Sequence, residues 1–127
     1  MVQVGASLRV EIFVADLDVT VSFYERLGFG LTARSDGPPR YAAFRLGEAR
    51  VGAAEAEAVD PGLRAAPVGT EIVLEVDDVR GTRDRLVTAG VDLVADLQRR
   101  PWGLEDFRLT DPDGYYYRFT NRRTPGR

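Results

Sequence analysis

The sequence predicts an α+β domain made of two successive units, each consisting of a strand, a helix and further strands. In two separate segments, apolar and polar residues alternate with a period of two, as in strands with one buried face, and each segment runs into a helical pattern. The whole arrangement repeats at a constant offset of 62 residues, which matches Val10 to Ile72 and Asp16 to Asp78. Strand residues and helix caps that agree at one offset indicate a duplicated unit.

The first unit begins with a strand over residues 8–14, whose apolar members share one face. Asp16 offers side-chain oxygens to cap the following helix, and Gly28 is placed to end it in a left-handed conformation. Residues 35–39 have the composition of a turn. Three more strands are predicted at residues 29–33, 41–46 and 49–54.

The second unit repeats this order. Residues 71–76 form its first strand, Asp78 caps its helix and Gly90 stops it. The sequence Asp-Pro-Asp-Gly at 111–114 predicts a tight turn, because proline presets one backbone dihedral and glycine accepts a positive φ. Three more strands are predicted at residues 91–95, 106–110 and 115–120.

These elements define the expected boundaries. The first module covers about residues 7–55 and the second about residues 70–122, within a single domain over 1–127. Residues 56–69 are rich in alanine, glutamate, proline and glycine, and we expect them to form an exposed linker.

The remaining strand residues predict a charged inner face, with the helices on the outside of the sheet. This face takes the strand positions of opposite parity to the helix-facing ones. Its members are Arg9, Glu11 and Phe13 from the first unit, and Glu71, Val73 and Glu75 from the second. Because charged side chains are costly to bury in a dry core, this face predicts a solvated cleft of ligand size.

The composition excludes several classes of chemistry. The chain has no cysteine, no histidine and no lysine, which removes disulfides, thiolate nucleophiles, Cys/His metal sites, imidazole catalysis and Schiff-base chemistry. A net charge of −3 disfavours binding to nucleic acid or to anionic membranes. The sequence contains neither a long apolar run nor a signal-peptide pattern, so we expect a cytoplasmic protein.

Several short motifs, in their order and spacing, carry a resemblance to a known family. In the first half they are Val14-Ala15-Asp16-Leu17, Ser22-Phe23-Tyr24 and Leu27-Gly28-Phe29. In the second half they are Val76-Asp77-Asp78-Val79, Ala89-Gly90-Val91 and Asp111-Pro112-Asp113-Gly114. The chain thereby resembles the vicinal oxygen chelate superfamily of glyoxalases, bleomycin resistance proteins and extradiol dioxygenases. Trp102-Gly103, followed by Phe107, is similar to the metal-free, bleomycin-resistance-like branch.

The resemblance implies a specific architecture. Two tandem βαβββ modules would form one curved, mixed, eight-stranded sheet, a cup with the helices outside. Proteins of this kind are commonly homodimers, so a second copy of the chain is an expected partner.

The resemblance also locates the positions at which metal-dependent members hold a divalent ion. They fall at Arg9, near Gly52, at Glu71 and at Arg118. Only Glu71 has lone pairs for a cation, because an arginine side chain is a donor without acceptor capacity at ordinary pH. We therefore expect neither a metal nor another cofactor.

The same positions predict a different site, in which Arg9, Glu71 and Arg118 converge. One interpretation is a structural ion network, because buried charges are normally paired. The other is a ligand site, in which spare guanidinium donors meet an anionic or carbonyl group of a ligand.

Three aromatic residues are candidates for contact with a ligand. Phe13 and Tyr116 have the parity of the inner face, and Trp102 is the sole tryptophan. Flat rings around a charged centre suit a planar organic molecule. Ordinary packing is the alternative, and Trp102 has burial at a dimer interface as a third option. The complete predicted ligand-binding set is Arg9, Glu11, Phe13, Glu71, Glu75, Trp102, Tyr116 and Arg118.

The leading functional prediction is a non-catalytic protein that binds a planar drug or natural product, with antibiotic resistance or self-resistance as its role. Three acids against two arginines on the inner face favour a neutral or weakly cationic ligand. One alternative is a metal-free lyase or isomerase, with Glu71 as general base and Arg9 and Arg118 stabilising an oxyanion. The other is a domain that serves only as an interaction module.

Overall fold

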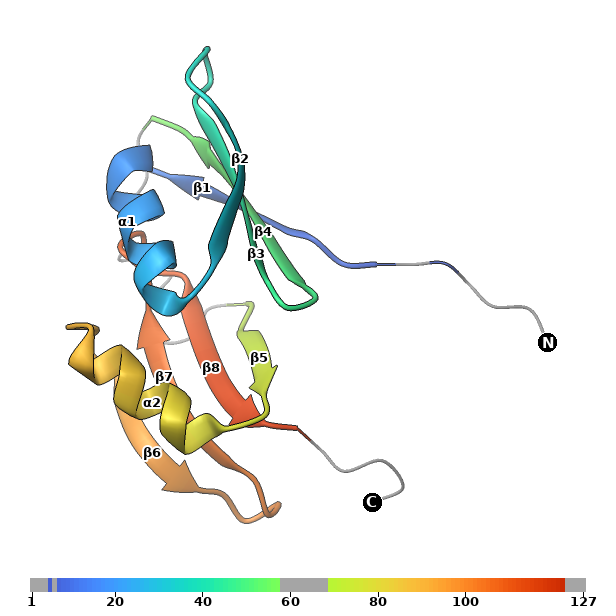
Figure 1. Ribbon diagram of the computed structural model, residues 1–127, viewed down its shortest axis with the longest axis vertical. Helices are drawn as coiled ribbons and strands as arrows, with labels where there is room; N and C mark the ends of the chain where they lie inside the picture. Colours follow the sequence, from blue (N-terminus) through green and yellow to red (C-terminus); the bar gives the residue numbers. More distant parts are fainter. Residues whose placement is uncertain (1–4, 6, 58–68, 123–127) are drawn as a thin grey trace. The chain divides into compact units, whose positions relative to one another are not determined.

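The computed structural model describes residues 5, 7–57 and 69–122, and the chain divides into two compact units, Met1–Val59 and Asp60–Arg127. The predicted linker over 56–69 lies largely outside the described residues. The first unit contains β1 (Val10–Val14), α1 (Leu17–Leu27), β2 (Gly30–Ser35), β3 (Tyr41–Leu46) and β4 (Ala49–Glu55). The second contains β5 (Ile72–Val76), α2 (Val79–Thr88), β6 (Ala95–Arg99), β7 (Glu105–Thr110) and β8 (Tyr116–Asn121) (Figure 1).

The two units share one topology. In the first, the strands pair in the order β1-β4-β3-β2, and in the second they pair in the order β5-β8-β7-β6. In each unit the first strand runs parallel to the last, and the other pairs are antiparallel. The prediction of an α+β fold with two tandem βαβββ modules and eight strands is confirmed. The strands pair as two four-stranded sheets, one in each unit, where one eight-stranded sheet was expected.

The core of the first unit lies between its sheet and α1, which packs along one face of the sheet (Figure 1). Tyr24 of α1 is fully buried, and its ring stacks on Phe44 of β3 at a centroid distance of 5.2 Å. Phe29 closes the same cluster edge-on, at 5.5 Å from Tyr24. Each such aromatic pair adds roughly 0.5–1.5 kcal/mol beyond the burial of its surface.

The second unit builds its core in the same way. Phe107 of β7 and Phe119 of β8 are both fully buried and stack at a centroid distance of 4.9 Å. Helix α2 packs against these two strands and contributes Leu86, which is also fully buried. The alternation along β7 and β8 therefore places large apolar residues toward the helix.

Helix α1 begins and ends where local chemistry requires. The Asp16 carboxylate accepts hydrogen bonds from the backbone N–H groups of Asp18 at 3.0 Å and Val19 at 3.3 Å. These bonds satisfy two of the donors that a helix start leaves without partners. At the other end Gly28 adopts φ 104°, a conformation that side chains disfavour, and its N–H caps the helix.

The strand predicted at 91–95 is wrong, because β6 instead spans Ala95–Arg99. The reason is the end of α2, where Gly90 adopts φ 85° and the Val91 N–H bonds back to the Leu86 carbonyl at 3.0 Å. The backbone N–H of Val91 is therefore used at the end of the helix and not in the sheet. The chain joins the sheet only at Val94, whose N–H donates to the Arg108 carbonyl at 2.8 Å.

Candidate functional site

The first sheet presents Glu11 and Phe13 on the face that α1 does not cover. Along β1, Ile12 and Val14 are fully buried, whereas Phe13 has 53% of its surface exposed. The predicted parity of this strand is therefore correct. The strand pairing continues the row of Phe13 through Ala54 of β4 to Tyr41 of β3. Phe13 and Tyr41 thus stand on either side of a strand with a small residue between them.

Glu11 and Tyr41 are joined across β4. The Tyr41 hydroxyl lies 2.9 Å from one Glu11 carboxylate oxygen and 3.1 Å from the other. Gly52 of β4 makes this possible, because a side chain there would collide with the Tyr41 hydroxyl and the Glu11 carboxylate. Arg9 adds an ion pair, with its Nε at 2.8 Å from Glu11 Oε1. Burial, and then the hydrogen bond to Glu11, raises the pKa of Tyr41 above its ordinary value of 10.0.

Sequence reasoning did not carry Tyr41 into the predicted ligand-binding set. It considered Gly52 only as a position at which relatives hold a metal. A signal was present, since a glycine inside an otherwise regular strand marks a close approach by another group. Which group approaches depends on the pairing of three strands, and no local pattern specifies that.

In the second unit the predicted pair Glu71 and Arg118 is formed. Arg118 Nε donates to Glu71 Oε1 at 2.9 Å, and less than a quarter of each side chain is exposed. The second arginine near Glu71 in this unit is Arg108, whose Nη1 lies 3.8 Å from Glu71 Oε2. Arg9, the expected third member, belongs to the first unit and pairs there with Glu11.

Arg108 leads to a further acid that the sequence analysis missed. Asp106 is fully buried and accepts three hydrogen bonds from Arg100, at 2.9–3.1 Å. Its Oδ1 also lies 3.5 Å from Arg108 Nε. Burial alone would raise the pKa of Asp106, but the hydrogen bonds from Arg100 and the nearby positive charge of Arg108 outweigh it and hold the pKa below the ordinary value of 3.8.

The three other predicted residues lie in different settings. Glu75 is exposed on β5, with the parity expected for it. Trp102 lies in the turn between β6 and β7, with 49% of its surface exposed. Tyr116 retains only 7% exposure, and a hydrogen bond between its phenol and Arg108 raises the pKa of that guanidinium. Tyr116 therefore offers almost no ring surface to a ligand and acts through its hydroxyl.

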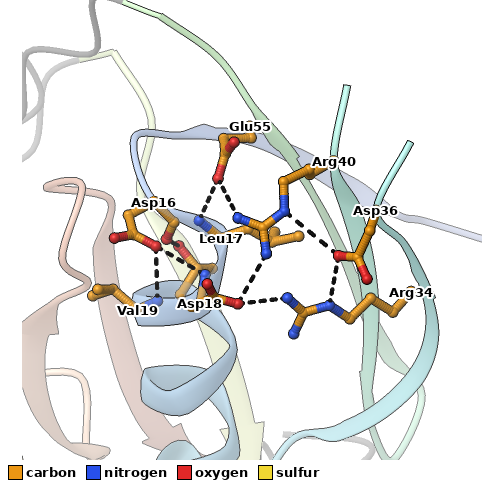
Figure 2. A network of polar contacts seen from close by, with 9 residues as sticks. Asp16, Leu17, Asp18, Val19, Arg34, Asp36, Arg40 and Glu55 are labelled. Carbon is orange, nitrogen blue, oxygen red and sulfur yellow. Dashed lines mark hydrogen bonds and ion pairs between the residues drawn. The ribbon is translucent and has the colours of Figure 1, made fainter. Parts of the chain in front are cut away.

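A second polar cluster surrounds the start of α1 (Figure 2). Glu55 accepts from the Leu17 N–H at 2.9 Å and from Arg40 at 3.2 Å. Asp18 accepts from Arg40 at 2.9 Å and from Arg34, and these hydrogen bonds hold its pKa below the ordinary value. The cluster joins the helix start to the ends of β2, β3 and β4.

A cavity of about 670 Å³ lies beside this cluster, between the turn at 36–40 and the end of β4. It is a concavity that the sequence analysis did not foresee. Its guanidinium, Arg40, is already held by Asp18 and Glu55 and lies 3.5 Å from Asp36. These contacts indicate a structural role for the cluster, which holds the start of α1 to the ends of the neighbouring strands.

Within the described ranges, no three side chains of His, Cys, Asp or Glu come together in a way that could hold a metal ion. A search of the same residues finds no helix long and apolar enough to cross a membrane.

Several solved structures of other proteins are similar to the structure of this chain. The solved structure of a bleomycin resistance determinant encoded on the transposon Tn5 has a TM-score of 0.77 at 22% identity, over 94% of this chain and 99% of that one. A bleomycin-binding protein complexed with bleomycin has a TM-score of 0.75 at 22% identity, over 93% and 99% of the two chains. TioX from Micromonospora sp. ML1 has a TM-score of 0.74 at 28% identity, over 94% and 100%.

These structures share the fold of this chain. No curated protein matches the sequence. The sequence model of the Glyoxalase/Bleomycin resistance protein/Dioxygenase superfamily matches residues 7–119. Because that match and the tandem βαβββ modules cover nearly the same residues, the chain belongs to the glyoxalase/bleomycin resistance protein/dioxygenase superfamily.

Proposed function

We propose that this protein binds a small planar aromatic molecule on the open face of its first sheet and sequesters it without chemical change. The observation that carries the proposal is the exposure of Phe13, at 53%, between two fully buried strand neighbours. Apolar surface left in water costs about 25 cal/mol per Å² relative to burial, so a ring that stacks on Phe13 gains by covering it.

The surroundings of Phe13 suit a flat ligand. Ala54 lies beside Phe13 in the neighbouring strand and carries only a methyl group, so a ring system meets little obstruction on that side of Phe13. Glu11 and Tyr41 add polar groups beside this apolar surface, and a few placed polar groups among apolar ones are typical of small-molecule sites.

The biological role follows from sequestration. Among structures of this fold, one is described as a bleomycin resistance determinant and another as a bleomycin-binding protein in complex with bleomycin. A protein that holds a toxic natural product lowers its free concentration and thereby protects the cell that carries it. We extend the proposal to a homodimer, in which the exposed ring of Trp102 contacts either the ligand or the second copy.

The test is a titration of the protein with a panel of flat aromatic antibiotics, followed by calorimetry and by the fluorescence of Trp102. Phe13→Ala is compared with wild type and with Val19→Ala, a control that removes a similarly exposed apolar side chain from α1. We expect at least one compound to bind, with a loss of roughly two- to tenfold in Phe13→Ala and no loss in Val19→Ala. Equal affinity in all three proteins would contradict the proposal.

The titration also separates binding from catalysis. Each bound compound is recovered, and its molecular mass is measured by mass spectrometry. An unchanged mass supports sequestration. A changed mass, abolished by Glu71→Gln without loss of binding, would establish the metal-free enzyme with Glu71 as its base.

A further inference from the structure

The second sheet holds two arginines side by side around one carboxylate. The antiparallel pairing of β7 and β8 sets Arg108 directly opposite Arg118. Glu71, immediately before β5, lies 2.9 Å from Arg118 Nε and 3.8 Å from Arg108 Nη1. The second of these distances is too long for a hydrogen bond, so Glu71 is engaged mainly with Arg118.

The donors of these two guanidinium groups exceed the acceptors around them. A guanidinium carries five N–H groups. Within the part of the chain that the structure describes, Glu71 is the hydrogen-bond acceptor of Arg118, through a single Nε contact. Arg108 Nε is buried and has no hydrogen-bond partner of normal geometry, although Asp106 lies 3.5 Å away.

Positive charges also outnumber negative charges around these two arginines. Arg100, Arg108 and Arg118 face two acids, Glu71 and Asp106, in this connected cluster. Arg100 donates three hydrogen bonds to Asp106. Arg108 therefore shares its nearest carboxylates, Asp106 at 3.5 Å and Glu71 at 3.8 Å, with the other two arginines, and it also has a hydrogen bond with the Tyr116 phenol. Glu75 is exposed farther along β5 and makes no ion pair with them. Between 21% and 23% of the Arg108 and Arg118 side chains is exposed, so the surplus positive charge is largely removed from water.

We propose that Arg108 and Arg118 together bind an oxyanion, a carboxylate or a phosphate group of a small ligand. Charge-assisted hydrogen bonds from two guanidinium groups are among the strongest that proteins make, and an anion would supply the acceptors that the cluster lacks. Arg108 and Arg118 thereby form the arginine pair of this site, and this inference expects an anionic ligand group in place of the neutral or weakly cationic ligand predicted from the charges of the inner face. This inference goes beyond the proposed function, because an anion held on the second sheet does not require the aromatic surface of the first.

The experiment uses naphthoate and naphthamide, which have the same rings and differ in charge, with inorganic phosphate as a second oxyanion. Binding to the full chain is followed by calorimetry and by the NMR signals of the arginine Nε–H groups. We expect naphthoate to bind about tenfold more tightly than naphthamide, and Arg118→Gln to remove that difference. Arg80→Gln is the control, because Arg80 pairs with Glu105 on the surface of α2 and should leave the difference unchanged.

A second variant keeps the test decisive if Arg118→Gln does not fold. Glu71→Gln removes the carboxylate that competes for the two arginines, so naphthoate should bind several-fold more tightly to it. A larger response to phosphate than to naphthoate would identify a phosphate group as the natural anion. Equal binding of naphthoate and naphthamide, or weaker binding of naphthoate to Glu71→Gln, would overturn the proposal. If that equal binding still depends on Phe13, the proposed function stands while this inference fails.

Discussion

The Tyr41 hydroxyl of β3 donates to the Glu11 carboxylate of β1 across the strand between them, in the space that Gly52 leaves open. The three residues come from three strands, and the backbone of β4 holds the outer two in register. The pair fixes a polar group next to the exposed ring of Phe13. It therefore connects the pairing of the first sheet to the surface on which we expect a ligand to bind.

Replacing Gly52 with alanine should separate this pair. A methyl group at position 52 meets both the Tyr41 hydroxyl and the Glu11 carboxylate, so one of them has to move. Loss of the hydrogen bond should lower the free energy of unfolding by about 1 kcal/mol in a denaturant titration. Gly30→Ala is the matched control, because its nearest neighbour is the Arg45 carbonyl at 3.8 Å. An equal effect of the two substitutions would show that Gly52 has no special role.

The ionisation of Tyr41 should report the same contact. Burial and the Glu11 carboxylate both raise the pKa of Tyr41 above 10.0. Glu11→Gln removes the negative charge but not the burial, so the pKa of Tyr41 should fall toward 10.0 without reaching it. The measurement is the tyrosinate absorbance across a pH titration, with Tyr41→Phe in each background to isolate this one residue. No shift in Glu11→Gln would contradict the contact.

Asp106 should stabilise the second unit strongly. Asp106→Ala leaves Arg100 and Arg108 without their buried carboxylate and should cost about 3 kcal/mol of unfolding free energy at neutral pH. The control is Asp96→Ala, since Asp96 also pairs with an arginine, Arg83, but is 60% exposed, and its loss should matter far less.

The same carboxylate gives the stability a defined pH dependence. Because the folded pKa of Asp106 lies below 3.8, folding favours its ionised form. This stabilisation is complete above pH 3.8 and is lost as the pH falls through the lower folded value. Asp106→Asn should therefore unfold with a shallower pH dependence below pH 3.8 than wild type, when both are followed by circular dichroism. Parallel acid transitions would contradict this assignment.

The oligomeric state is a separate prediction. We expect a homodimer, so light scattering at micromolar concentration should give about twice the chain mass of 14.0 kDa. If Trp102 lies in the interface, Trp102→Ala should shift the equilibrium toward the single chain. A mass near 14.0 kDa for wild type would contradict the dimer.

Local chemistry explains which parts of the structure the sequence could predict. The alternation along β1 predicted that Ile12 and Val14 are buried while Phe13 is exposed. The helix caps at Asp16 and Gly28 could also be predicted from the sequence, since each depends on residues within one helical turn. The prediction failed at 91–95, where an apolar segment matched a strand. There the Val91 N–H is already engaged in the hydrogen bond that ends α2, so this residue does not join the sheet.

The parts that sequence reasoning missed depend on strand register. Arg108 lies beside Arg118 because β7 and β8 pair at one offset, and Asp106 meets Arg100 across a turn. The parity of Arg108, between the buried Phe107 and Leu109, could have placed it on the charged face. Its proximity to Glu71 required the order β5-β8-β7, which emerges only when the strands are assembled.

The most direct test of the account is a crystal structure of this protein with the planar antibiotic that binds it most tightly. We predict an intact compound on the open face of the first sheet, with a ring of the compound stacked on Phe13 and a polar group near Glu11 or Tyr41. A compound bound away from Phe13, or one found converted to a product, would contradict the claim that this protein sequesters its ligand on that face.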